Sequence, residues 1–231
     1  MRNSEAGCFN VELLDLSILK NYPIYRQKIF WRGIKMEIEI LKESGFEEAI
    51  TGMRNPLNSW EKSDTAGDEI GEADKNLALK LINAGKDHRK FMRMITVWLD
   101  IKAPLYWWKQ FDTYKIGTVA NSCSTMHKIH SKEFTEDDFE WGLDSDSLKI
   151  VIKRLNECRE KFLETKDKVY WLEIIKLLPS SYNQKRTVML NYEVLINICE
   201  NRKNHKLSEW NSFIDHIAEN LKYPELIFKR N

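Results

Sequence analysis

The sequence has no cysteine motif of the kind that marks a zinc site or a disulfide framework. Its four cysteines are Cys8, Cys123, Cys158 and Cys199; none lies in a C-x-x-C pair, and their spacing matches no zinc pattern. Isolated cysteines in a chain of 231 residues are typical of reduced thiols in a cytosolic protein. We therefore predict a cytoplasmic protein without a bound metal ion.

Long apolar runs and an excess of one charge are also missing. No apolar stretch approaches the roughly 18 residues of a membrane span, and we expect no signal segment. The 36 Lys and Arg residues nearly match the 35 Asp and Glu residues, which leaves a net charge of +1. Because no large basic field is present, we expect neither a nucleic-acid partner nor a membrane partner.

Aromatic residues, in contrast, are abundant, at 11% of the chain with eight Trp. Trp107 and Trp108 are followed within a short distance by the polar residues Gln110, Asn121, Ser122 and Ser124. A helix that only fills a core needs apolar residues at a 3.6 period, so this mixture is typical of a pocket that stacks a flat ring. An aromatic core element followed by a Ser/Asn turn explains the same spacing, and the sequence leaves both interpretations open.

Hydrophobic periodicity predicts one α+β domain, with an N-terminal sheet wrapped by helices and a helical C-terminal half. Strands are expected at 36–41 and within 91–101, and helices at 46–52, 72–84, 105–111, about 144–162, 169–178, 186–200 and 207–221. Residues 113–124, which contain Gly117, are expected to be irregular.

The chain also divides into two parts by pattern. Residues 1–35 have no clean period, whereas a clear alternation of apolar and polar residues begins at Met36. We therefore expect an N-terminal extension over 1–35 and one domain over 36–231.

Short motifs spread from Met36 to Leu226 carry a resemblance to a known family. They are His88 before a strand, Ala103-Pro104 leading into Lys109 to Lys115, Thr118 to His127, and the ungapped run from Pro179 to Trp210. Together they resemble the motifs of flavin-dependent thymidylate synthases. The resemblance implies reductive methylation of dUMP, or of a related pyrimidine nucleotide, by a methyltransferase that uses FAD, NADPH and methylene-tetrahydrofolate.

The same resemblance implies a central antiparallel sheet wrapped by helices, a homotetramer and roles for individual residues. Tyr106, Trp107, Trp108 and Trp210 are the expected interface residues. Ser124 and His88 are expected to be catalytic, while His88, Tyr114, Lys115, Asn121, Asn191 and Asn197 are expected to bind the cofactor. Gln110, Ser122, Ser124 and Arg202 are expected to bind the nucleotide.

Several arginines of the family are replaced in this chain. The Arg-His-Arg triplet reads Thr113-Tyr114-Lys115, and Met126, Ile175 and Glu193 stand where the family has Arg. FAD and dUMP both carry phosphates, for which the forked guanidinium is the strong partner. The cations that can take over this task are Lys109, Lys115, Lys128 and Arg89. The alternative is a non-catalytic nucleotide-binding protein that kept the fold and lost the arginine-rich flavin site.

Overall fold

The computed structural model describes residues 36–140 and 145–228, which form an α+β fold around one antiparallel sheet. Its strands are β1 (Glu37–Ser44), β2 (Thr96–Pro104), β3 (Thr118–Ser122) and β4 (Asn183–Asn191), in the order β1-β2-β4-β3. All three strand pairs are antiparallel, which confirms the predicted fold class. The expected extension over 1–35, and Asp144 at the expected start of a helix, lie outside the described residues.

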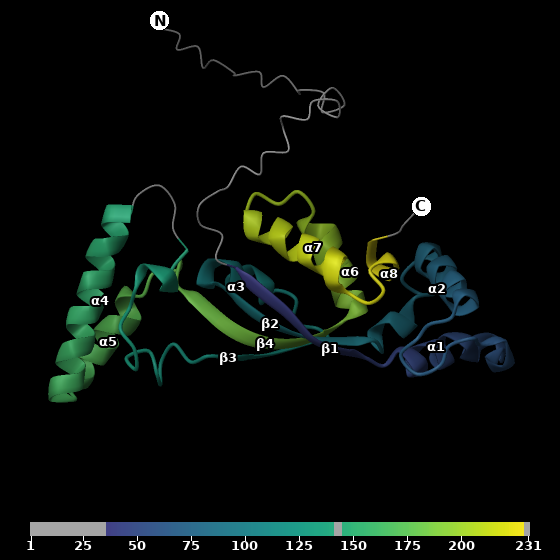
Figure 1. The fold of residues 1–231 in the computed structure, drawn as a ribbon, viewed down its shortest axis with the longest axis horizontal. Helices are drawn as coiled ribbons and strands as arrows, with labels where there is room; N and C mark the ends of the chain where they lie inside the picture. The colour runs from purple at the N-terminus through teal and green to yellow at the C-terminus, as the bar shows by residue number, and fades with distance from the viewer. Residues whose placement is uncertain (1–35, 141–144, 229–231) are drawn as a thin grey trace, which may run out of the picture. The chain divides into compact units, whose positions relative to one another are not determined.

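Eight α-helices are described around this sheet (Figure 1). They are α1 (Phe46–Arg54), α2 (Glu72–Ala84), α3 (Leu105–Phe111), α4 (Ser145–Thr165), α5 (Lys168–Leu177), α6 (Tyr192–Arg202), α7 (Ser208–Asn220) and α8 (Glu225–Phe228). The helices predicted at 72–84 and 105–111 have those bounds in the structure, and those near 46, 148, 169 and 207 are confirmed with small shifts. No helix in the described part of the chain is long and apolar enough to cross a membrane.

The helix predicted over 186–200 is wrong in its first third, which belongs to β4. Val188 and Leu190 are buried while Lys185 and Thr187 are exposed, which is the alternation of a strand. The helix α6 begins only after Asn191, whose side chain accepts a hydrogen bond from the Val194 N–H (3.0 Å). The apolar residues of α6 made the preceding residues look like part of the same helix. In the structure these residues pair with β2 and β3 instead, and this long-range pairing decides their conformation.

The prediction of irregular backbone over 113–124 is also wrong in part. Gly117 has a φ of 77° and turns the chain, after which Thr118 to Ser122 pair with β4 as the edge strand β3. All of β3 except Thr118 is exposed, so the segment carries no buried apolar alternation that sequence reasoning could detect. Residues 118–122 of the expected loop therefore form a strand, whose side chains point alternately to the two faces of the sheet.

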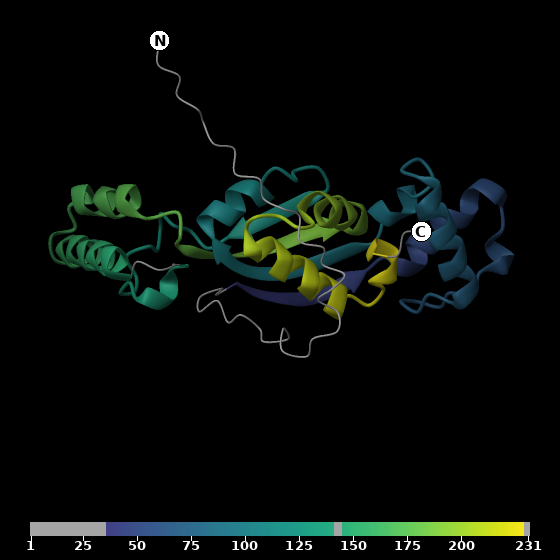
Figure 2. The same cartoon turned by 90° about the horizontal axis from the view of Figure 1, so that it is seen from above.

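One face of the sheet packs against helices. Figures 1 and 2 show α6 and α7 lying over this face, with α3 beside them. Val97, Leu99 and Ile101 of β2 are fully buried on this side. Because neighbouring side chains of a strand point to opposite faces, the strand register places Thr118, Ala120 and Ser122 on the helix-covered face. Val119 and Asn121 lie on the opposite face.

A second apolar cluster lies under α4 and α5, apart from the main core. Leu148, Leu155 and Cys158 of α4 form the buried stripe that the sequence predicts, and Ile174 of α5 packs with them. Phe139 contributes from the connection that precedes α4. This helical pair therefore has its own core.

Candidate functional site

The paired tryptophans belong to the protein core. Trp107 and Trp108 are both fully buried, and Trp107 packs on Trp210 with ring centroids 4.7 Å apart. The indole N–H of Trp108 donates to the Gln184 carbonyl (2.9 Å). The interpretation of these rings as a stacking platform is therefore wrong, and they are equally unavailable as interface residues because their own chain covers them.

Gln110, Tyr114 and Arg202, three residues expected at the site, do lie together. The Arg202 guanidinium donates to the Tyr114 hydroxyl (3.0 Å) and to Gln110 Oε1 (3.2 Å), which also accepts from the Trp210 indole (2.9 Å). Arg202 additionally lies over the Trp210 ring, 4.8 Å from its centroid. This network joins the end of α3, the turn after it and the end of α6, and it fixes the position of the Tyr114 ring.

The start of α3 is fixed in a similar way. The Tyr106 hydroxyl donates to Glu209 of α7. Burial and the hydrogen bond to Glu209 both raise the pKa of Tyr106, so its hydroxyl stays protonated and continues to donate. The start of α3 is therefore anchored to α7, and its end is anchored to both α6 and α7.

A pocket of about 340 Å³ opens between the end of α3 and β3; it is called the Lys115 pocket below. Its lining residues are Phe111, Asp112, Tyr114, Lys115, Thr118 and Ala120. Within residues 36–140 and 145–228, Lys115 has no ion-pair partner, and the buried Thr118 Oγ1 has no hydrogen-bond partner. The Phe111 ring is almost fully buried, so Tyr114 is the aromatic side chain of the lining that a ligand can contact. A free cation, a free hydroxyl and the Tyr114 ring suit a ligand with a flat ring and an anionic group.

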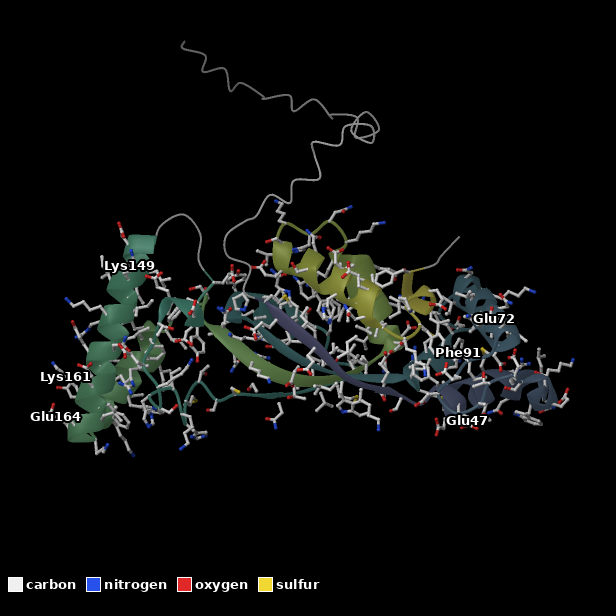
Figure 3. The ribbon with its side chains drawn as sticks, viewed as in Figure 1. Glu47, Glu72, Phe91, Lys149, Lys161 and Glu164 are labelled. Atoms are coloured by element: carbon white, nitrogen blue, oxygen red, sulfur yellow. The ribbon has the colours of Figure 1, made fainter. Side chains whose placement is uncertain are left out.

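One wall of the pocket carries an ion pair that sequence reasoning missed. Asp112 accepts from Arg186 (2.8 Å), and Arg186 lies over the Trp108 ring at 4.3 Å from the centroid. Sequence reasoning missed this pair because it assigned most of residues 183–191 to a helix. If the segment had been predicted as a strand, Gln184 and Arg186 would have been expected on one face of the sheet together with Ser122. The charged side chains labelled in Figure 3 lie on α1, α2 and α4, none of which lines this pocket.

Two other expected site residues, Ser124 and Asn191, make local structural contacts. Ser124 Oγ accepts from the Met126 N–H (3.1 Å) and the His127 N–H (2.9 Å), so it closes a turn. Asn191 caps α6, and by register Asn121 lies on the opposite face of β3 from Ser122. His88 is exposed in the connection between α2 and β2, and Asn197 is half-buried on α6.

Arg89 does not provide the free cation that we expected at a phosphate site. Its Nε and one terminal nitrogen donate to both carboxylate oxygens of Glu193, at 2.8 and 3.0 Å, and both side chains are buried. Glu193 stands where the resembling family has Arg, so the pair neutralises two charges inside the protein. Lys109, Lys115 and Lys128 remain exposed.

Comparison with known proteins gives matches in structure but not in sequence. Neither a protein-family model nor a curated protein matches the chain. Thymidylate synthase X (ThyX) from Helicobacter pylori, crystallised with FAD and dUMP, superposes with a TM-score of 0.69 at 18% identity, over 84% of this chain and 97% of that chain. A second structure, described as the flavin-dependent ThyX of the same organism with FAD and dUMP, gives 0.67 at 17% identity, over 83% and 98%.

A third solved structure extends the similarity to another activity. The UMP/dUMP methylase PolB from Streptomyces cacaoi, bound with 5-Br UMP, superposes with a TM-score of 0.57 at 13% identity, over 84% of this chain and 93% of that chain. Together these matches show that the described residues have a divergent ThyX-like fold.

Proposed function

We propose that the protein is a divergent flavin-dependent methyltransferase that acts on dUMP or a related pyrimidine mononucleotide. The observation that carries the proposal is the Lys115 pocket, with its free cation, its free hydroxyl and the Tyr114 ring, on a ThyX-like fold. The three solved structures that support it hold dUMP or 5-Br UMP.

The size and lining of the pocket favour a mononucleotide. A volume of about 340 Å³ is at the lower end of the roughly 300–1,000 Å³ that is typical of small-molecule sites. Tyr114 provides a surface against which a pyrimidine ring packs, and Lys115 provides the charge for its phosphate. Thr118 Oγ1 is buried and unpartnered, and a polar atom of the ligand would satisfy its hydrogen-bonding capacity.

The network around Arg202 prepares this pocket for binding. Arg202 and Gln110 hold the Tyr114 side chain before a ligand arrives, so little side-chain entropy is lost on binding. Arg202 itself is occupied by three side chains of its own protein, Tyr114, Gln110 and His205. We therefore assign it to the positioning of Tyr114.

A dinucleotide such as FAD needs more room than this pocket offers, but the turn before β2 has groups that fit its phosphates. Lys86, Lys90 and Arg93 are exposed and have no ion-pair partner in the described part of the chain, and His88 lies among them. This donor set fits a phosphate-bearing flavin, with Asn197 as a further amide donor. When bound, FAD would supply hydride from NADPH to reduce a one-carbon unit taken from methylene-tetrahydrofolate.

The proposal includes assembly into a homotetramer, in which the turn at 86–93 of one chain completes the site of another. Light scattering on the purified protein tests this part separately. A mass of four chains is expected, and a monomer that still methylates dUMP would contradict a shared site.

One observation favours the non-catalytic alternative. The buried Arg89–Glu193 pair removes one of the cations that were candidates for the ligand phosphates. A protein that binds the nucleotide and forms no product would fit this loss.

Product analysis separates the two functions. The purified protein is incubated with FAD, NADPH, methylene-tetrahydrofolate and dUMP, and dTMP is measured by mass spectrometry. We expect dTMP from the wild type, a loss of at least roughly tenfold in Lys115→Ala, and no change in the control Lys153→Ala, an exposed lysine of α4. Binding of dUMP without dTMP supports the non-catalytic alternative, and the absence of dUMP binding contradicts both functions.

A further inference from the structure

We propose that Arg186 is a second phosphate-recognition residue of the Lys115 pocket, and that Asp112 occupies it until the nucleotide phosphate takes its place. The inference rests on the proposed function, because it assumes that the pocket receives a nucleotide. It adds to that function a guanidinium that none of the sequence motifs indicated.

The Arg186 side chain is held in one orientation before any ligand binds. Its Nε donates to Gln184 Oε1 (3.0 Å), and its guanidinium carbon lies over the buried Trp108 ring, 4.3 Å from the centroid. Gln184 is itself buried and donates through Nε2 to the Cys123 carbonyl (2.7 Å). A guanidinium fixed by stacking and by its Nε loses little freedom when it binds an anion.

The strand register places Arg186 at one end of the pocket. Arg186 of β4 pairs with Ser122 of β3, and the preceding pair on the same face joins Val188 to the pocket residue Ala120. Asp112, the acceptor of the Arg186 ion pair, also lines the pocket. Lys115 and Thr118 line the pocket as well, whereas Arg186 lies behind Asp112 and borders the pocket through this ion pair.

Asp112 is suited to be displaced by a ligand. Its side chain is 50% exposed, whereas that of Arg186 is 15% exposed, so the carboxylate gains little from a pair that water screens. The bond uses one terminal nitrogen of Arg186, and the other terminal nitrogen has no hydrogen-bond partner in the described part of the chain. A phosphate oxygen pair can engage both terminal nitrogens, which is the stronger, bidentate arrangement.

The Asp112 carboxylate and the nucleotide phosphate compete for Arg186, and the charges predict the effect of each substitution. The Asp112 carboxylate repels a phosphate that enters the pocket, and Arg186 attracts it. Removal of the Arg186 charge should therefore weaken phosphate binding, and removal of the Asp112 charge should strengthen it. A nucleoside without a phosphate should respond to neither change.

Titration calorimetry with the full chain tests these three statements, with dUMP and deoxyuridine as probes. In Arg186→Gln, dUMP affinity should fall by roughly ten- to hundredfold, because one charge-assisted contact is lost. In Asp112→Asn, dUMP affinity should rise severalfold. Deoxyuridine affinity should stay within twofold in both variants, as should every value in the matched control Arg154→Gln, whose pair with Glu157 lies on the exposed face of α4.

The outcomes separate this inference from the function on which it rests. A wild type that does not bind dUMP overturns both. Binding of dUMP that is lost in Lys115→Ala and unchanged in Arg186→Gln overturns only the role of Arg186, as does an equal loss of dUMP and deoxyuridine, which indicates a structural role. If Arg186→Gln does not fold, Asp112→Asn still decides: weaker dUMP binding in that variant overturns the proposed competition.

Discussion

Two arginines show how differently this chain uses the same side chain. Arg89 is buried and donates to both carboxylate oxygens of Glu193, so its charge is neutralised within the protein. Arg186 shares its charge with the half-exposed Asp112 at the edge of a pocket. Burial therefore separates a structural guanidinium from one that a ligand can reach, although the sequence presents both as isolated basic residues.

Removal of one partner from the buried pair should be costly. In Glu193→Gln, Arg89 keeps its charge and loses its counter-ion, and we expect the free energy of unfolding to fall by about 3 kcal/mol or more. Urea denaturation measures this change. The matched control Glu157→Gln breaks the exposed pair with Arg154 on one helix and should cost less than about 1 kcal/mol. Equal effects of the two variants would show that the Arg89–Glu193 pair is not a buried charge pair in solution.

A second buried carboxylate predicts acid sensitivity. Burial raises the pKa of Asp74, but hydrogen bonds from Ser63, Thr65 and Arg54 together outweigh it and leave the pKa below its usual value. A carboxyl group with a lowered pKa in the folded state stabilises the protein above its unfolded pKa of about 3.9 and loses this contribution as the pH falls through the folded value. Urea denaturation at about pH 6 and about pH 3 should therefore show a smaller loss of stability in Asp74→Asn than in the wild type. Parallel losses in the two proteins would exclude Asp74 as a cause.

At this scale the sequence predicts some of the site and misses the rest. Gln110, Tyr114 and Arg202 were expected at the site, and the structure joins them in one network. Asp112 and Arg186 were not expected, because 74 residues separate them and they meet only in the folded chain. Long-range contacts of this kind leave no periodic signal in the sequence.

The elements around the pocket depend on the turn that joins α3 to β3. Gly117 occupies the left-handed region at a φ of 77°, and a Cβ at this position would meet Asn191 Nδ2 at 2.7 Å and Val194 Cγ2 at 3.2 Å. This close approach brings the turn against the start of α6, beside the Asn191 cap. Lys115 and Thr118 lie on either side of this turn and line the pocket. The shape of the pocket therefore depends on a backbone conformation that requires glycine.

Gly117→Ala should therefore disturb both stability and ligand binding. We expect a larger loss of unfolding free energy than the roughly 1–2 kcal/mol of a left-handed backbone alone, together with weaker dUMP binding. Gly67→Ala is the matched control, because Gly67 also has a positive φ, 57°, and an added Cβ would meet nothing within 4 Å. Thermal unfolding and dUMP titration of both variants check this; similar values would show that the Asn191 contact does not constrain the turn.

The helices and strands also differ in how well the sequence predicts them. α2 ends at Gly85 and α3 begins after Pro104. Both residues are local signals of a helix boundary, and the predicted bounds of these two helices agree with the structure. β3 is exposed along most of its length and β4 carries Gln, Lys and Arg, so neither has the apolar alternation of a half-buried strand. Their strand conformation comes from pairing with distant segments, which a local pattern does not contain.

At the scale of the whole molecule, a ThyX-like fold persists at 18% identity to the Helicobacter pylori enzyme. The fold places the end of α3, the turn after it and β3 around one pocket, and Lys115 and Asp112 provide the charges of its lining. The fold alone does not establish the activity, because one fold can carry different functions. The proposed methyltransferase activity therefore requires both the ThyX-like fold and a pocket whose side chains can bind the nucleotide.

The flavin part of the proposal is tested on the intact protein. After incubation with FAD and removal of the unbound cofactor, we expect visible flavin absorption that NADPH bleaches and air restores. The triple variant Lys86→Ala, Lys90→Ala, Arg93→Ala should retain less FAD, because it removes the unpaired cations of the turn before β2. Equal FAD retention by the wild type and the triple variant would exclude this turn as the diphosphate site.

The location of the nucleotide is the central claim, and a crystal structure of the protein with 5-bromo-UMP tests it most directly. Bromine scatters anomalously, so its position is found independently of any assumption about the ligand. We predict one bromine peak per chain in the pocket lined by Phe111, Tyr114 and Ala120, with the phosphate near Lys115. A bromine peak elsewhere on the chain, or none at saturating ligand, would contradict the assignment of this pocket as the nucleotide site.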